Sequence, residues 1–341
     1  MTAAPLVIPF FIPHQGCPHQ CVFCNQSVIT GKNDRVIASE MERLIQDYLP
    51  FKGHRKRVEF AFFGGNFLGL PPHRICYLLE RVYPYVEKGL VHGVRCSTRP
   101  DTVTRDVLDL VCSYGLELVE LGVQSLDDGV LAASERGHTR EDTLKALELL
   151  KSKNMKIGVQ VMVGLPGDTL GKALETVRVL AGRTPDLARI YPLLVLAGSK
   201  MAQWYAQGRY TPLSLDDAVM QVKEMYKVFF RAGVPVVRMG LQSGEMMSDP
   251  SQMLAGPWHP AFGHLVYSAL MFDQVCAAID ALPQIHSMGT IQLQVSSRSL
   301  SRLQGNKKIN LQRLAEKYPG MGFQIIINDT LSPDQVIAIK D

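Results

Sequence analysis

The sequence lacks the features that would place it in a membrane or outside the cell. No apolar stretch approaches the roughly 20 residues of a membrane span, and the N-terminus lacks the charged, apolar and small-residue order of a signal peptide. The seven cysteines are odd in number and unevenly spaced, which argues against a disulfide framework and fits a reducing compartment. These absences predict a cytoplasmic protein with no membrane partner.

The chain also has no internal repeat, no low-complexity tract and no second cysteine cluster. Its 341 residues exceed one average domain, and a hydrophobic fraction of 46% supports a packed core, so we expect one large unit with a smaller appendage. The net charge of +4 permits a polyanionic partner without requiring one. We interpret the basic run at residues 52–57 as a solvated loop between a helix and a strand.

Two hydrophobic periods alternate along the first two thirds of the chain. Six apolar runs have the character of strands, and segments whose apolar residues recur at helical spacing lie between them. The runs lie at residues 7–12, 58–63, 94–98, 116–124, 157–163 and 187–196. Pro192 predicts that pairing of the sixth run ends or bulges there. Strands that are apolar on both faces and alternate with amphipathic helices indicate a parallel sheet covered by helices. The sequence therefore predicts an α/β fold, with a partial (βα)6 parallel barrel over residues 1–245.

The rest of the chain, residues 246–341, is expected to form a small α+β extension. A helix is predicted at residues 264–281, a strand at 291–295, a helix at 311–317 and a strand at 323–327.

In a parallel barrel the loops that follow the strands lie at one end, where chemistry collects. These loops carry the unusual residues of the chain, namely the cysteines of residues 17–24, Gly64, Gly65, Asn66, Thr98, Arg99, Gln124, Ser125, Gly164, Pro166 and the region around Tyr191. We therefore expect these residues to converge on one face.

The loop after the first strand holds Cys17, Cys21 and Cys24 within eight residues. A zinc site usually takes four ligands, and His14 and His19 are near enough in sequence to complete one. Three closely spaced thiolates without a fourth partner suit an iron–sulfur cube with one open iron. The other four cysteines are interpreted as packing residues in helices and a strand, at Cys76, Cys96, Cys112 and Cys276.

The spacing of Cys17, Cys21 and Cys24, with Phe23 before the last cysteine, resembles the signature loop of radical S-adenosylmethionine (SAM) enzymes. That resemblance implies a 4Fe-4S cluster whose open iron binds the amino and carboxylate groups of SAM. One-electron reduction from an external reductant would cleave SAM into methionine and a 5′-deoxyadenosyl radical that takes hydrogen from a substrate. The cofactor would supply this chemistry, and the protein orientation and exclusion of water.

The resemblance also implies cofactor-binding roles for residues on the rim. Gly64, Gly65 and Asn66 match the family's glycine-rich motif, which contacts the methionine amino group, although many members have an acidic residue where this chain has Asn66. Guanidinium geometry suits carboxylate, so Arg99 is expected at the SAM carboxylate. Gln124 and Ser125 are expected at the ribose. The backbone of Gly164 to Gly167, which includes Pro166, is expected against the adenine, and Phe23 is expected beside the cofactor.

One subgroup is matched nearly letter for letter, at residues 120–125 and at Arg136, Gly137, His138 and Thr139. It includes the catalytic subunit of the elongator complex, which modifies tRNA, and it is more distantly similar to oxygen-independent coproporphyrinogen oxidases. Arg136 and His138 are thus candidate catalytic residues, although a solvated histidine before a helix N-cap is an equal interpretation of His138. About 95 residues follow the barrel, which is short for the elongator subunit's acetyltransferase domain.

Three hypotheses follow for the function. The first is a radical SAM enzyme that acts on tRNA, another RNA or another unassigned substrate. The second is the same chemistry on a small molecule such as a porphyrinogen. The third is a non-catalytic iron–sulfur or zinc binding protein, which predicts no cleavage of SAM. The sequence leaves the oligomeric state open.

Overall fold

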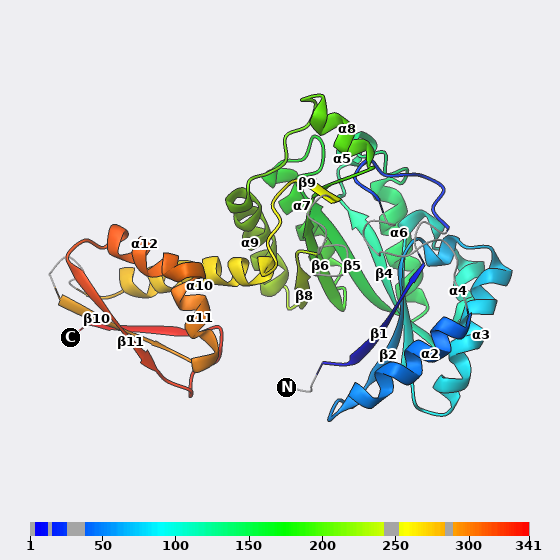
Figure 1. Ribbon diagram of the computed structural model, residues 1–341, viewed down its shortest axis with the longest axis horizontal. Coiled ribbons are helices and arrows are strands. Elements are labelled where there is room, and N and C mark those ends of the chain that lie inside the picture. The colour runs from blue at the N-terminus through cyan, green and yellow to red at the C-terminus, as the bar shows by residue number, and fades with distance from the viewer. Residues whose placement is uncertain (1–3, 13–15, 26–37, 242–251, 284–288, 341) are drawn as a thin grey trace. The chain divides into compact units, whose positions relative to one another are not determined.

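The computed structural model describes residues 4–12, 16–25, 38–241, 252–283 and 289–340 (Figure 1). Contacts divide the chain into two compact units. The first comprises Met1–Ser214 with Met225–Trp258, and the second comprises Leu215–Glu224 with His259–Asp341. Each unit is described by itself below. The division between domains at residues 245 and 246 stays a prediction.

The first unit is built on one parallel sheet of seven strands in the order β1-β2-β3-β4-β5-β6-β8. Figure 1 shows these strands side by side, with helices on their outer face. The strands are β1 (Leu6–Ile12), β2 (Val58–Gly64), β3 (Gly93–Thr98), β4 (Leu116–Gln124), β5 (Lys156–Val163), β6 (Leu187–Pro192) and β8 (Val236–Met239). This arrangement confirms the predicted partial barrel.

The helices between the strands confirm the alternation read from the sequence. They are α2 (Ala38–Tyr48), α3 (Pro72–Glu87), α4 (Arg105–Cys112), α5 (Asp128–Ala133), α6 (Arg140–Ser152), α7 (Leu170–Gly182), α8 (Lys200–Ala206) and α9 (Leu215–Arg231). Thr139 and Asp142 form a reciprocal capping box at the start of α6. This box satisfies backbone donors that the first helical turn leaves free.

The sixth strand ends where its proline predicts. Strand β6 stops at Pro192, and the short strand β7 (Val195–Leu196) then pairs antiparallel with β9 (Met253–Ala255). This pairing joins residues up to Trp258 to the first unit. The seventh strand of the barrel, β8, was not predicted, because its four residues are too few to show a repeating hydrophobic pattern.

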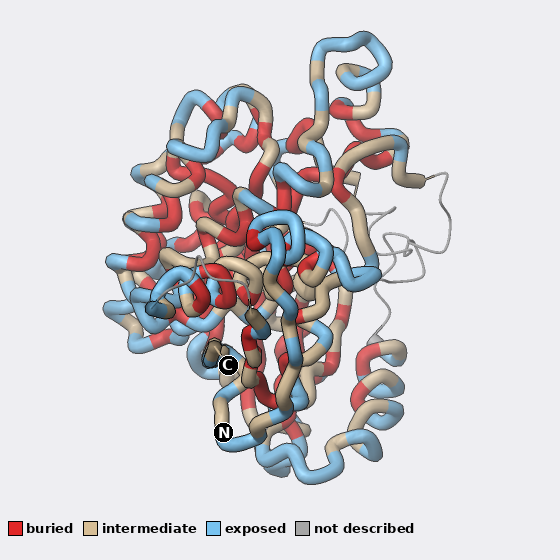
Figure 2. The backbone as a smooth tube through the Cα atoms, turned by 90° about the vertical axis from the view of Figure 1, so that its left-hand side faces the viewer, coloured by how far each residue is buried: buried red, intermediate tan, exposed pale blue. Residues whose placement is uncertain are grey.

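The two faces of the barrel sheet differ in chemistry. Large apolar side chains such as Phe10, Phe60 and Phe62 are almost fully buried on one face. Figure 2 marks the buried parts of the backbone in red. The neighbouring positions on the other face form a buried ion-pair network that joins four strands, through Glu59, Arg95, Glu120 and Arg189. Each buried carboxylate has a guanidinium partner, as burial of charge requires.

The second unit packs helices against a three-stranded sheet in the order β11-β10-β12. Its elements are α10 (Phe262–Asp280), β10 (Gly289–Val295), α11 (Leu300–Gln304), α12 (Ile309–Lys317), β11 (Met321–Ile327) and β12 (Val336–Lys340). The expected small α+β extension is therefore confirmed. Helix α11 and strand β12 were not predicted.

One expectation about apolar stretches was wrong. Helix α10 is long and apolar enough to cross a membrane by length and composition, with a mean hydropathy of 1.3. Its side chains Met271, Val275 and Ile279 lie in the core of the second unit with Ile291 and Leu293 of β10. Packing in that core accounts for the buried part of α10, which is 39% of its apolar window.

Candidate cofactor site at the barrel rim

The cysteine loop follows β1 and is fixed to the barrel through its backbone. The Val22 amide donates to the Ser134 carbonyl at 3.1 Å, and the Val22 carbonyl accepts from the Met201 amide at 2.7 Å. The Val22 side chain is fully buried. Cys21 is buried, whereas Cys17 and Cys24 are partly exposed.

The two metal alternatives for this loop need different arrangements of ligands. Across the ranges that the structure describes, no three His, Cys, Asp or Glu side chains come close enough to hold a single ion. A 4Fe-4S cube does not need such convergence, since each thiolate binds a different iron. His14, one of the two histidines of the zinc alternative, lies outside the described residues, and His19 packs against Gly137, where a Cβ would lie 2.3 Å from the imidazole ring.

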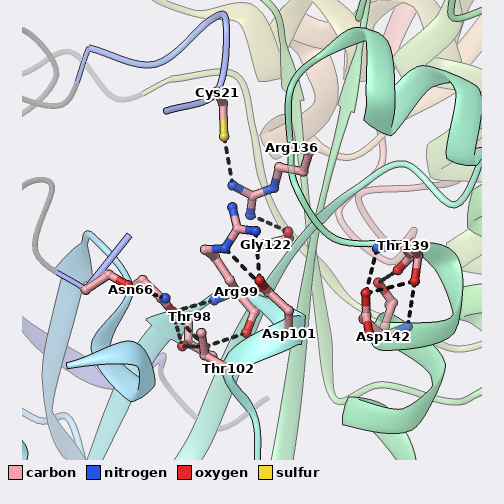
Figure 3. Close-up of polar contacts among 12 residues, drawn as sticks. Cys21, Asn66, Thr98, Arg99, Asp101, Thr102, Gly122, Arg136, Thr139 and Asp142 are labelled. Atoms are coloured by element: carbon pink, nitrogen blue, oxygen red, sulfur yellow. Dashed lines mark hydrogen bonds and ion pairs between the residues drawn. The ribbon is translucent and has the colours of Figure 1, made fainter. Parts of the chain in front are cut away.

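Arg136 connects the cysteine loop to the end of β4 (Figure 3). Its Nη1 donates to Sγ of Cys21 at 3.2 Å, and its Nη2 donates to the Gly122 carbonyl at 2.6 Å. Gly122 leaves room for this side chain, because a Cβ there would lie 2.7 Å from Nη2. Burial raises the pKa of the Cys17 thiol, while the charge of Arg136 opposes that rise. The guanidinium thus favours thiolates in this loop.

Arg99 lies near Arg136 and has one guanidinium nitrogen without a hydrogen-bond partner among the described residues. Its Nε and Nη2 form a bidentate pair with Asp101, at 2.9 Å each. Its Nη1 is buried and makes no hydrogen bond to any described residue, although the side chain is only 2% exposed. A buried guanidinium nitrogen without an acceptor is costly, so an anionic group would satisfy it.

His138 is buried rather than solvated, which corrects the solvated interpretation. The residue is 4% exposed, and neither ring nitrogen makes a well-formed hydrogen bond within the described chain. Burial, together with the charges of Arg136 and Arg99, lowers the pKa of His138 to about 3, and burial is the largest cause. The imidazole is therefore neutral at physiological pH, so it can donate from one nitrogen and accept at the other.

Asn66 joins the cysteine loop to the end of β3. Its Nδ2 donates to the Gly16 carbonyl at 2.7 Å. Its Oδ1 accepts from the Thr98 hydroxyl at 2.6 Å, the Arg99 amide at 2.9 Å and the Thr102 hydroxyl at 2.8 Å. The oxygen that was expected to accept from the SAM ammonium is therefore already engaged. That expected contact stays a prediction, and Asn66 has a second task in holding two rim loops together.

The other glycine-motif residues lie beside the cysteine loop. Gly64 is the last residue of β2 and pairs with Ile12 of β1, and the Gly65 amide donates to the Ile12 carbonyl at 3.1 Å. Gly64 has a φ of +85°, which only glycine adopts without strain. The backbone of this motif therefore turns at the point where the cysteine loop begins.

The ends of β4 and β5 complete the rim. Gln124 has a φ of +66°, which is unusual for a residue with a side chain, and the β4–β5 register shifts beside it. The Ser125 hydroxyl accepts from the Asp127 amide at 3.1 Å. The Gly164 carbonyl accepts from the hydroxyl of Tyr210 at 2.6 Å.

Other expected site residues differ in exposure and packing. Pro166 is partly exposed two residues beyond Gly164. Phe23 packs partly buried against the apolar cluster that contains Val22 and Met201.

Several residues at the rim were missed by the sequence interpretation. Thr102 and Tyr210 were not singled out, because a threonine in a turn and a tyrosine after a short helix carry no signal of their own.

Among the four other cysteines, Cys96 and Cys276 are buried and Cys76 is partly buried. Cys112 is exposed, so its interpretation as a packing residue was wrong. All seven cysteines are free of disulfides, as predicted.

A parallel half-barrel with three cysteines after its first strand, and buried cationic side chains beside them, defines an iron–sulfur enzyme. Residues 11–180 match the Radical SAM superfamily, and residues 185–271 match the Radical_SAM C-terminal domain. The chain therefore belongs to the radical SAM superfamily. Enzymes of this superfamily use a 4Fe-4S cluster and SAM.

Relatives are found among proteins with and without a stated activity. The chain is 29% identical over 210 residues to the uncharacterized protein MJ0486 of Methanocaldococcus jannaschii, covering 58% of this chain and 64% of that one. It is 29% identical over 231 residues to a tRNA uridine(34) acetyltransferase of Dehalococcoides mccartyi, covering 58% and 50%. It is 26% identical over 289 residues to elongator complex protein 3 of Homo sapiens, covering 69% and 53%. The chain thus spans 50% to 64% of the length of these relatives.

Among solved structures, the chain is similar to the Elp3 protein of Methanocaldococcus infernus with an N-terminal deletion. The TM-score is 0.61 at 19% identity, over 79% of this chain and 63% of that one. At this identity the likeness establishes the fold, and it confirms the barrel with its small extension.

Proposed function

We propose that this radical SAM enzyme acts on tRNA or another RNA. Support for the RNA comes from the relatives, of which one is named a tRNA uridine(34) acetyltransferase and another elongator complex protein 3. These proteins are longer than this chain, so their shared radical SAM part is the basis of the proposal. A porphyrinogen or other small substrate is the alternative.

The observation that supports SAM binding best is the set of buried, unsatisfied nitrogens beside the cysteine loop. They are Nη1 of Arg99, Nε of Arg136 and both ring nitrogens of His138. Buried nitrogens that lack a partner on three neighbouring polar side chains, two of them cationic, form a site for an anionic group. When bound, a cluster reduced by one electron from an external donor would supply the cleavage of SAM into methionine and a 5′-deoxyadenosyl radical.

Roles for the residues of this chain follow from their positions. Cys17, Cys21 and Cys24 bind the cluster irons, and Nη1 of Arg99 binds the SAM carboxylate. The backbone at Gly64 and Gly65 approaches the SAM amino group, with Asn66 holding that turn.

On the far side of the rim, Gln124 and Ser125 face the ribose, and the turn at Gly164 and Pro166 lies against the adenine. Phe23 packs beside the cofactor.

Arg136 and His138 act on the electrostatics of the site rather than as proton donors. Arg136 holds Cys21 and places a positive charge beside the cluster. His138 is neutral, so it is suited to orient a bound group by hydrogen bonds and not to supply a proton. We further propose a cytoplasmic location with an external one-electron reductant, since a cluster and four further unpaired cysteines suit a reducing compartment.

The test is anaerobic reconstitution of the protein with iron and sulfide, followed by reduction in the presence of SAM. We expect 5′-deoxyadenosine from the wild type and much less from Arg99→Met at equal iron content. Arg105→Met removes an exposed guanidinium and is the matched control. A protein that holds about four irons but forms no 5′-deoxyadenosine would refute the enzyme proposal.

The substrate is tested by adding bulk tRNA or a porphyrinogen to the same reaction. We expect tRNA to increase 5′-deoxyadenosine formation and to gain a mass change in its nucleosides. Stimulation by porphyrinogen with no effect of tRNA would favour the small-molecule alternative instead.

A further inference from the structure

The second unit has one segment whose charge is nearly all of one sign. Residues 297–320 contain six basic residues and one acidic residue, so their net charge of +5 exceeds the +4 of the whole chain. The segment comprises α11, α12 and their connection, which are adjacent in Figure 1. We call this surface the α11–α12 basic surface, formed by Arg298, Arg302, Lys307, Lys308, Arg313 and Lys317.

Ion pairs within the described residues engage only part of this surface. Arg302 pairs with Asp334 at 3.3 Å, and Lys317 pairs with Asp280 at 3.6 Å. No carboxylate among the residues that the structure describes pairs with Lys307, Lys308 or Arg313, all of which are exposed. Three of the six basic side chains therefore have no carboxylate partner among the described residues and are available to an external anion.

The arginines are held in place by aromatic rings of α10. The Arg313 guanidinium lies 4.2 Å from the ring centroid of Phe272, and that of Arg302 lies 4.5 Å from the ring centroid of Tyr267. Such contacts fix the position of a guanidinium while leaving its edge free to bind an anion. The surface is thus partly preorganised.

The two lysines between the helices stand in a turn that is fixed from beneath. Lys307 and Lys308 both have left-handed backbone conformations, with φ of +50° and +62°. The buried Asn310 holds this turn, because its Nδ2 lies within 3.0–3.1 Å of the Ser268 carbonyl, the Ser268 hydroxyl and the Arg302 carbonyl. The connection therefore presents two adjacent positive charges to solvent in one fixed conformation.

From these features we infer that the α11–α12 basic surface docks the phosphate backbone of the RNA substrate. The inference rests on the proposed action on RNA and assigns that partner to a surface in the second unit. Closely spaced lysines and arginines displace the counterions of a nucleic acid, which gives affinity that falls steeply with salt. Arg313 supplies paired donors for phosphate oxygens, and the lysines supply point charges.

The experiment measures binding of bulk tRNA to the cluster-loaded protein, without SAM or reductant, at a series of salt concentrations. In Lys307→Gly/Lys308→Gly we expect about tenfold weaker binding at low salt and a slope of log Kd against log salt that is smaller by about 2. Glycine accepts left-handed conformations, so this variant removes the charges without unfolding the turn. A melting temperature equal to that of the wild type would verify that the variant is folded.

Two further variants make the result specific. Lys307→Arg/Lys308→Arg keeps both charges and is expected to bind tRNA as the wild type does. Lys145→Ala/Lys151→Ala removes two charges from the exposed face of α6 and is expected to leave tRNA binding within about twofold. Equal losses in this control and in the glycine variant would overturn the inference.

The outcomes separate this inference from the proposed function. If the wild type binds tRNA and the glycine variant binds equally well, docking on this surface is refuted while the RNA substrate stands. If the wild type binds no tRNA but binds vesicles of anionic phosphatidylglycerol through the same lysines, the surface docks a membrane and the inference is wrong. Formation of 5′-deoxyadenosine tests the radical chemistry in either case.

Discussion

Arg136 and Cys21 lie 115 positions apart in the chain, yet Nη1 of Arg136 donates to Sγ of Cys21 at 3.2 Å. The same guanidinium is anchored on the other side by the Gly122 carbonyl. A cationic donor thus points at one of the three thiols proposed to bind the cluster. Hydrogen bonds and charge at cluster sulfurs are among the factors that set the reduction potential of an iron–sulfur centre.

We expect Arg136→Met to make the cluster harder to reduce, because a thiolate without its cationic donor leaves more negative charge on the cluster. Loss of one charge-assisted hydrogen bond, about 1.4 kcal/mol, corresponds to a shift of about −60 mV for a one-electron couple. Potentiometric titration followed by electron paramagnetic resonance measures the shift. Arg136→Lys keeps the charge and should fall between the two, whereas identical potentials in all three proteins would contradict the assignment.

The cysteine variants test which thiols bind iron. Cys21→Ala should lose most of its iron and sulfide after reconstitution, because only two thiolates remain for the cube. Cys96→Ala should keep the cluster, since Cys96 is fully buried in β3 and acts as a small apolar residue. The cost of Cys96→Ala is expected to be about 1–2 kcal/mol of unfolding free energy. Equal iron contents in the two variants would refute the ligand assignment.

The link between Asn66 and Gly16 makes a stability prediction. Asn66→Ala removes one hydrogen bond each from the Gly16 carbonyl, the Arg99 amide and the hydroxyls of Thr98 and Thr102. We expect a loss of about 2–4 kcal/mol, which lowers the melting temperature of a chain of this length by roughly 5 °C. Differential scanning calorimetry measures it.

A second variant at this position isolates the bond to the cysteine loop. Asn66→Asp keeps the acceptor oxygen but replaces the donor to Gly16 with a repelling oxygen. Its melting temperature should fall less than that of Asn66→Ala, while its cluster should still be lost faster than in the wild type under a chelator. A cluster as long-lived as that of the wild type would show that the Gly16 contact does not hold the loop.

The environment of Asp168, which lies in the turn after β5, predicts that the stability of the protein depends on pH. Burial raises the pKa of Asp168 to about 6, although the Thr169 amide and Lys172 oppose this rise. The folded state therefore holds the proton more tightly than the unfolded state. The resulting stabilisation is fully present below about pH 4 and is lost as pH rises through about 6.

Asp168→Asn should remove this dependence and stabilise the protein at pH 7.5 by about 1–2 kcal/mol, a figure reduced for partial exposure of the side chain. The gain should vanish at pH 4. Urea unfolding at the two pH values provides the measurement. A variant that is no more stable than the wild type at pH 7.5 would show that Asp168 is not desolvated.

Much of the barrel followed from the sequence because its signals are local. Strands apolar on both faces and helices with one apolar stripe have periods that can be read from a few residues, and Pro192 and the Thr139–Asp142 pair mark ends of elements directly. Strand β8 and helix α11 escaped prediction because they are too short to show a period. The spacing of the three cysteines likewise lies within one loop.

What the sequence determined by itself is therefore the order of elements, the three-cysteine loop and the superfamily. Only the tertiary structure decided how the rim residues interact, because each contact joins loops that are far apart in the chain. It showed His138 buried and neutral where a solvated residue was equally expected, and Asn66 engaged by four protein groups. Burial and hydrogen-bond partners are set by packing between strands, and no local pattern encodes them.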